Sequence, residues 1–174
     1  KFADIRETVA PLWNLVNMSK YASMVIQYTR GCPYQCEFCD VTALFGRRTR
    51  TKNTEQIIAE LDTFYNLGWR GNVFFVDDNL IGNRRSLKKD LLPAIIKWQE
   101  NHTGITFNTE VSINLAKDES LLQMMSKAGF NTVFVGIETP DTDSLSECGK
   151  SQNKDRDLAE DVRIIQRAGL QVQA

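Results

Sequence analysis

Three of the four cysteines in this chain lie within eight positions of one another, in the stretch "RGCPYQCEFCD" that covers residues 30–40. They are Cys32, Cys36 and Cys39. Cysteine thiolates are soft ligands that favour zinc, copper(I) and iron–sulfur centres. A tetrahedral zinc site or a cubane cluster has four positions to fill. The stretch therefore predicts a metal centre that takes three ligands from one short loop and a fourth from elsewhere.

The spacing C-x3-C-x2-C narrows the kind of centre. It differs from the spacings of bacterial and plant-type ferredoxins, and a zinc ribbon needs a second C-x2-C pair. A loop of this length can hold three corners of a cubane and leave one iron open to a small molecule. Cys148 stays an alternative as fourth ligand or reactive thiol. The one histidine, His102, is expected at the opposite edge of the sheet, which makes it a poor candidate ligand.

The elements that must position these thiols alternate between strands and helices. Apolar runs predict four strands, over 23–29, 72–79, 105–113 and 132–139. Helical periodicity follows each of them, with Asn53 and Asp118 placed as N-caps and Pro93 placed to kink a long helix or start a new one. Apolar strands that alternate with helices imply a parallel sheet covered by helices.

Polar residues gather where these strands end. Asp77, Asp78 and Asn79 close the second strand, Glu110 lies near the end of the third, and Glu138 ends the fourth. Ligands of parallel sheets bind at the carboxyl ends of the strands, so we expect these side chains to face one opening together with the cysteine loop. A module that only transfers electrons or binds zinc would not need them, although both remain alternatives.

The stretch "CPYQCEFC" resembles the C-x3-C-x-aromatic-C signature of the radical S-adenosylmethionine (SAM) enzymes. The stretches "GNVFFVDDNLIGN", "TEVSINLA" and "VFVGIETPD" resemble the subgroup whose radical domain follows a cobalamin-binding domain. The resemblance implies an α/β fold, a partial (β/α)6 TIM-like barrel of about four to five β/α repeats. It also implies a [4Fe–4S] cluster on the three cysteines, with SAM as the fourth ligand. Reductive cleavage of SAM would then give a 5′-deoxyadenosyl radical.

The resemblance further implies a set of cofactor contacts. Phe38 would pack near the adenine, the Asp-Asp-Asn sequence would stand where many relatives carry Gly-Gly-Glu, and Lys150 would pair with the methionyl carboxylate. Glu110 would contact the methionyl ammonium or the ribose, and Glu138 the ribose hydroxyls. The full set of implied SAM-binding residues is Phe38, Asp77, Asp78, Asn79, Glu110, Ser112, Glu138 and Lys150.

The chain is expected to be part of a longer protein, because it starts at Lys1 and stops within a predicted strand. Residues 1–22 would be a lead-in and 23–174 the radical SAM core, with a cobalamin-binding domain upstream. The resemblance implies methylation or other modification of an unactivated carbon in a small molecule or lipid. It also implies an electron donor such as flavodoxin or ferredoxin.

Composition restricts the partners. The 22 acidic and 21 basic residues give a net charge of −1, which does not favour nucleic acid. The basic run from Arg47 to Lys52 is interpreted as a solvated loop. No apolar run approaches the ~20 residues that span a bilayer. Clustered thiols without an export signal predict the reducing cytoplasm.

Overall fold

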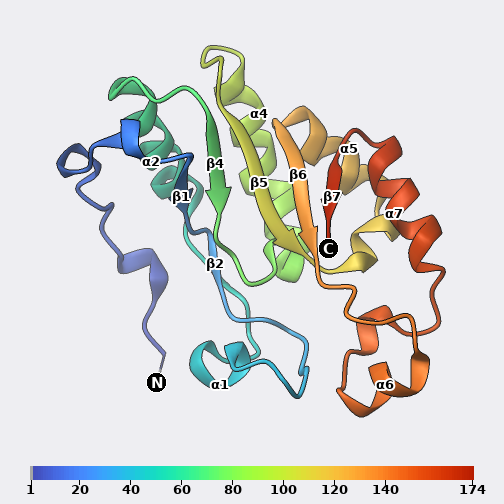
Figure 1. Cartoon of the computed structure of the whole chain (residues 1–174). Coiled ribbons are helices and arrows are strands. Elements are labelled where there is room, and N and C mark those ends of the chain that lie inside the picture. Colours follow the sequence, from blue (N-terminus) through green and yellow to red (C-terminus); the bar gives the residue numbers. More distant parts are fainter. Residues whose placement is uncertain (1) are drawn as a thin grey trace.

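The computed structural model describes residues 2–174 and contains one sheet of five parallel strands in the order β1-β4-β5-β6-β7 (Figure 1). All four neighbouring pairs are parallel. The strands are β1 (Ser23–Ile26), β4 (Asn72–Phe75), β5 (Thr106–Val111), β6 (Phe130–Val135) and β7 (Gln171–Gln173). The predicted α/β fold, a partial TIM-like barrel, is confirmed.

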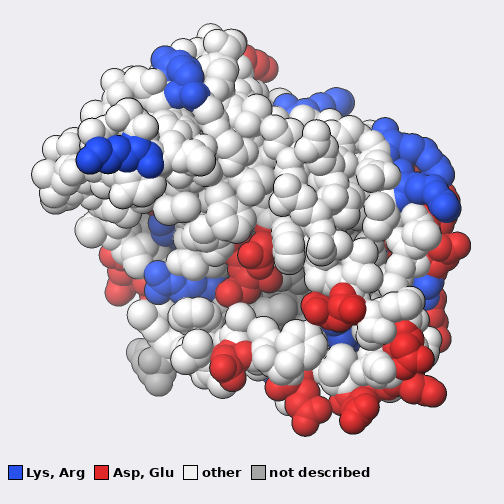
Figure 2. All heavy atoms as spheres, viewed as in Figure 1, with Lys and Arg blue, Asp and Glu red and all other residues white. Residues whose placement is uncertain are grey.

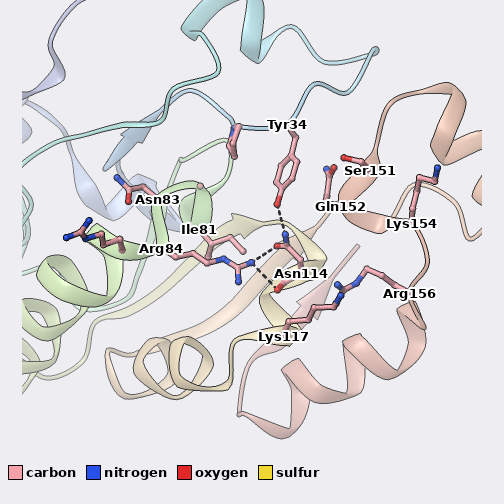
Figure 3. Close-up of a pocket in the computed structure, with 13 residues that line it drawn as sticks. Tyr34, Ile81, Asn83, Arg84, Asn114, Lys117, Ser151, Gln152, Lys154 and Arg156 are labelled. Carbon is pink, nitrogen blue, oxygen red and sulfur yellow. Dashed lines mark hydrogen bonds between the residues drawn. The ribbon is translucent and has the colours of Figure 1, made fainter.

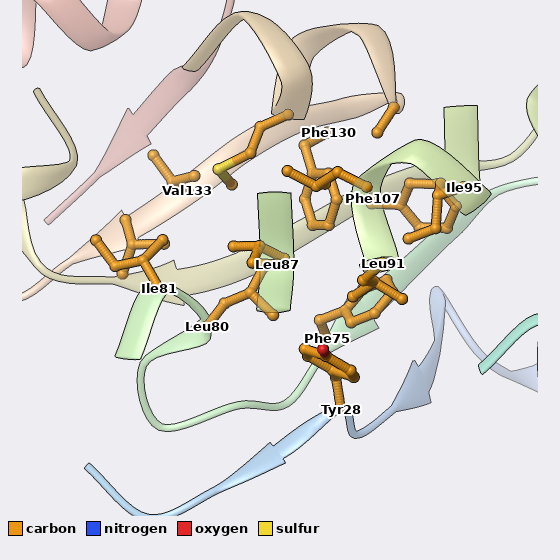
Figure 4. Close-up of a cluster of buried hydrophobic side chains, with 14 of the residues drawn as sticks. Tyr28, Phe75, Leu80, Ile81, Leu87, Leu91, Ile95, Phe107, Phe130 and Val133 are labelled. Carbon is orange, nitrogen blue, oxygen red and sulfur yellow. The ribbon is translucent and has the colours of Figure 1, made fainter. Parts of the chain in front are cut away.

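Four helices cover one face of this sheet (Figure 1). They are α2 (Thr54–Asn66), α4 (Leu92–Gln99), α5 (Glu119–Lys127) and α7 (Leu158–Arg167). Alternate strand residues point toward them, and Phe75, Phe107 and Val133 are fully buried there (Figure 4). This apolar layer is the core, and it fixes the register of the strands because a slip by one residue would expose it.

Local sequence signals set the helix ends. Asn53 accepts a hydrogen bond from the Gln56 backbone N–H (2.8 Å) while the Gln56 side chain accepts from the Asn53 N–H (3.0 Å), a complete capping box. The Asp118 carboxylate accepts from the Leu121 N–H at 3.1 Å. Gly68 ends α2 with a φ of +88°, a left-handed conformation that favours glycine. The predicted N-caps at Asn53 and Asp118 are confirmed.

The predicted strand 23–29 is interrupted. β1 ends at Ile26, and Thr29–Arg30 forms β2, which pairs antiparallel with β3 (Arg50–Thr51) outside the main sheet. The cause is Asp77, whose carboxylate accepts hydrogen bonds from the backbone N–H groups of Tyr28 (3.3 Å) and Thr29. Because these two backbone N–H groups are bound to Asp77, they cannot pair with a neighbouring strand of the main sheet. The chain therefore departs from the main sheet after Ile26.

The long helix predicted around Pro93 consists of three parts. α3 (Arg84–Ser86) leads into a π-helical turn over Leu87–Leu91, and α4 then begins with Pro93 in its first turn. Proline lacks an N–H and crowds the carbonyl four residues earlier. The wider turn, in which the Leu92 N–H donates to the Leu87 carbonyl, accommodates this residue.

The buried Asp77 makes the stability of the fold depend on pH. Burial raises the pKa of its carboxyl to about 7 from an ordinary value of 3.8. The unfolded chain releases this proton near pH 4, while the folded chain holds it up to about pH 7. We therefore expect the free energy of unfolding to fall as pH rises through this window, by at most ~1.4 kcal/mol per pH unit from this group. Urea unfolding of the wild type and of Asp77→Asn, between pH 4.5 and 8, tests this expectation; equal pH slopes would contradict it.

Two short helices lie in loops at the carboxyl end of the sheet: α1 (Val41–Phe45) and α6 (Thr142–Glu147). Neither is predicted from the sequence, because each is too short to carry helical periodicity. Within residues 2–174, no helix is long and apolar enough to cross a membrane.

Candidate active site at the carboxyl edge of the sheet

The cysteine loop runs from β2 to α1 at this edge. The four cysteines of the chain carry free thiols and are half-buried. Burial raises the pKa of the Cys32 thiol, and the neighbouring Cys36 and Cys39 raise it further. In the part of the chain that the structure describes, no three His, Cys, Asp or Glu side chains form a ready-made metal site. The structure therefore does not bring the three predicted ligands into a metal-binding arrangement, and their final geometry would be set by the group they bind.

A segment far along the chain supports this loop. The Glu37 N–H donates to the Cys148 carbonyl at 2.8 Å, and the Gln152 Nε2 group donates to the Cys36 sulfur at 3.6 Å. A Cβ added to Gly149 would come within 2.8 Å of the Gln35 carbonyl oxygen, so only glycine allows this close approach. Cys148 thus meets the loop through its backbone.

A chain of polar side chains joins the loop to the ends of two strands. The Asn114 side chain donates to the Tyr34 hydroxyl and accepts from the Ser112 hydroxyl at 2.9 Å. Asn79 donates to the Ser112 hydroxyl at 3.1 Å, and its side chain lowers the pKa of the Cys32 thiol in opposition to burial. Asn79 and Ser112 are among the SAM-binding residues that the sequence predicts. Tyr34 and Asn114 are not among the predicted site residues. These contacts hold the loop over the strand ends and restrict its freedom.

Carboxylates lie beside the loop with few partners. Burial raises the pKa of both Asp78 and Glu110, and the charge of Asp78 raises that of Glu110 further. The Asp78 Oδ2 and Asn108 Oδ1 atoms are buried without a hydrogen-bond partner among the described residues. Asn108 lies two residues before Glu110 on β5, so both face the same way. Figure 2 shows acidic side chains on both sides of a hollow at this edge. These acceptors suit a ligand that brings ammonium or hydroxyl donors.

A second cluster of predicted site residues lies near the loop that follows β6. The Lys150 Nζ atom lies 2.6 Å from the Glu138 carboxylate and 5.5 Å from the centroid of the Phe38 ring, which is 59% exposed. Glu138 has a φ of +64°, a conformation that is strained for a residue with a Cβ. A Cβ on Gly136 would lie 2.7 Å from both Glu138 and Lys150. The structure therefore brings these three predicted residues together.

Two interpretations from the sequence need correction. Asp77 does not face the opening with its neighbours, because it is only 1% exposed and is used to hold Tyr28 and Thr29. The basic run is not simply a solvated loop, because Lys52 is buried in an ion pair with Glu60 at 2.6 Å.

The face of the sheet that the helices leave uncovered is largely uncharged, as Figure 2 shows. Val25 and Phe134, at 40% and 46% exposed, are large apolar side chains on it. Val25, Phe74, Asn108 and Thr132 stand in register across four strands. This surface, next to the cysteine loop, is largely uncharged and mixes apolar side chains with polar ones.

The contact of Gln152 with Cys36 leads to a prediction about the cluster that the three cysteines are expected to hold. Hydrogen bonds to cluster sulfurs stabilise the more negatively charged reduced state and raise the reduction potential. We expect Gln152→Leu to lower the potential, on the order of 50 mV for one lost hydrogen bond. A redox titration followed by EPR measures this shift, with the exposed Gln166→Leu as a matched control. A potential that moves equally in both variants would contradict the assignment.

Comparison with known proteins agrees with this geometry. Residues 26–172 match the Radical SAM superfamily. An uncharacterized methyltransferase of Synechocystis sp. is 48% identical over 98% of this chain and 32% of its own length. The hopanoid C-2 methylase of Rhodopseudomonas palustris is 47% identical over 93% of this chain and 31% of its own length. The chain thus spans about a third of the length of these curated relatives.

The fold is also similar to that of a solved structure, the cobalamin-dependent SAM radical enzyme OxsB with aqua-cobalamin and SAM bound. The TM-score is 0.79 at 19% identity, over 99% of this chain and 26% of OxsB. The family match covers most of the chain. The chain therefore belongs to the radical SAM superfamily of enzymes, for which a [4Fe–4S] cluster and SAM are the implied cofactors.

Proposed function

We propose that the full-length protein is a cobalamin-dependent radical SAM methylase that adds a methyl group to an unactivated carbon of a small molecule or lipid. The observation that carries the proposal is the juxtaposition of three half-buried thiols, unpartnered acceptors and an uncharged sheet face at one edge. The likeness to a hopanoid C-2 methylase supports methylation and an apolar substrate.

The residues fit the two cofactors. Cys32, Cys36 and Cys39 would hold the cluster, and the unpartnered oxygens of Asp78 and Asn108 await hydrogen-bond donors. When bound, the cluster and SAM supply one-electron reductive cleavage of a carbon–sulfur bond. Glu110 would accept from the SAM ammonium, which would remove the cost of a half-buried carboxylate without a cation.

Other residues would position the adenosine. The exposed Phe38 ring would pack against the adenine, and the Glu138 carboxylate, oriented by Lys150, would accept from the ribose hydroxyls. Asn79 and Ser112 would act by holding the cysteine loop in place. Val25 and Phe134 would offer apolar contact to the substrate and exclude water from it.

The remaining parts of the proposal concern the domains and partners of the full-length protein. Residues 23–174 would form the radical SAM core, and a further domain of the full-length protein would bind cobalamin. An electron donor such as flavodoxin or ferredoxin would reduce the cluster. A module that only transfers electrons is disfavoured, because it would have no use for buried acceptors that face a ligand site.

The first experiment is anaerobic reconstitution of the full-length protein with iron and sulfide, followed by EPR of the reduced protein with and without SAM. We expect a cubane signal that changes when SAM is added. An EPR signal that does not change when SAM is added would favour an electron-transfer module. Stoichiometric zinc without a cluster would overturn the proposal. Transfer of a deuterated methyl group from SAM to a hopanoid then tests the substrate class.

A further inference from the structure

A second pocket, of about 660 Å³, lies against the cysteine loop (Figure 3). Tyr34 forms one wall. The other walls carry five cationic side chains and no Asp or Glu: Arg84, Arg85, Lys117, Lys154 and Arg156. The pocket shares none of its lining residues with the predicted SAM contacts.

The positive charge of this pocket is only partly compensated. Arg84 lies 3.7 Å from the Asp118 carboxylate, and Arg156 lies 2.5 Å from the Asp161 carboxylate. Within residues 2–174, Arg85, Lys117 and Lys154 form no salt bridge. In Figure 3 the Lys117 and Arg156 side chains extend toward one another from different elements. Cations that converge without an intervening carboxylate repel one another unless an anion lies between them.

Arg156 gives independent evidence for a ligand. Its side chain is only 4% exposed, and its Nη2 group is buried without a hydrogen-bond acceptor among the described residues. Leaving a buried cationic donor unpaired costs more free energy than leaving a neutral one. The Arg156 Nε atom already donates to Asp161, so the guanidinium is held in place while its buried Nη2 group still lacks an acceptor.

We propose that this pocket binds a phosphate group, either of inorganic phosphate or of a phosphorylated small molecule. A phosphate carries up to two negative charges and several strong acceptor oxygens, which suits an arginine fork together with two lysines. Lys117 and Arg156 would contact it, Lys154 would add to the positive potential of the pocket, and Arg84 remains bound to Asn114. This inference goes beyond the proposed methylation and does not depend on it.

Equilibrium dialysis of the full-length protein against radiolabelled inorganic phosphate, with SAM at saturation, tests the proposal. We expect one phosphate per chain and at least about tenfold weaker binding in Lys117→Gln/Lys154→Gln. The matched control is Lys97→Gln/Lys127→Gln, which removes the same charge from exposed sites on α4 and α5 and should leave affinity unchanged. Because binding is measured without turnover, the result is independent of whether SAM is cleaved.

Competition with a phosphate monoester identifies the source. Displacement by the ester at a lower concentration than unlabelled phosphate assigns the pocket to a phosphorylated molecule, and the reverse order assigns it to free phosphate. No saturable binding up to about 10 mM, equal loss in both double variants, or equal competition by citrate would overturn the proposal. Binding of an acidic peptide without any binding of phosphate would overturn it in favour of a protein partner.

Discussion

Replacing Cys36 with alanine is expected to abolish cluster binding and reductive cleavage of SAM. Loss of a direct ligand should reduce the rate well beyond the ~10–100-fold that loss of an outer-shell partner costs. The same result is expected for Cys32→Ala and Cys39→Ala, since each thiol would hold one of the three protein-bound irons. Iron content, the EPR signal of the reduced protein and formation of 5′-deoxyadenosine measure the effect.

Cys148→Ala is the matched control for this prediction. The Cys148 thiol lies 3.7 Å from the Leu145 carbonyl, and only the backbone of Cys148 meets the cysteine loop. Alanine preserves that backbone contact, so the variant should retain iron and activity. If Cys148→Ala lost iron as completely as Cys36→Ala, the cluster would have four protein ligands and no corner for SAM.

Glu110→Gln is expected to change SAM affinity and stability in opposite directions. A charge-assisted hydrogen bond to the SAM ammonium is worth ~1.5–3 kcal/mol, so its loss should weaken SAM binding by about 10–100-fold. Burial and the charge of Asp78 raise the pKa of Glu110 above its ordinary value of 4.5. The ionised carboxylate therefore disfavours the folded state above that pH, and the variant should be no less stable than the wild type near pH 7.

The measurements are SAM affinity by calorimetry and urea unfolding from pH 4 to 8. Glu119→Gln, an exposed change on α5, is the matched control and should leave SAM affinity unchanged. A variant that loses stability and SAM affinity together would show that Glu110 supports the fold. In that case its assignment as a SAM contact would be withdrawn.

Much of the fold could be predicted from the sequence, because the ends of its helices and the order of its elements depend on local sequence signals. The capping box at Asn53, the helix stop at Gly68 and the spacing of the three cysteines are each encoded within a few residues. Asn108 could also have been found, because it shares a strand face with Glu110. The strand–helix alternation then places all of these at known positions of a parallel sheet.

The rest depends on contacts between distant residues. Nothing near Gln152 indicates that its amide meets Cys36, and nothing near Asp77 indicates that its carboxylate turns inward to hold the backbone at Thr29. Asp77 follows the end of β4 and Gln152 lies in the loop after α6, and at either place a polar side chain can face a ligand or a neighbouring loop. Only the path of the loop across the sheet decides between the two.

The support of the cysteine loop by Gln152 has a consequence for the order of events during biosynthesis. The contact joins residues 116 positions apart in the chain. At the usual ~5–20 residues per second, a ribosome needs roughly 6–23 s to travel from Cys36 to Gln152. During that time the cysteine loop has been made but the segment that supports it has not. If the loop takes its final shape only with this support, insertion of the proposed cluster would follow translation of residue 152.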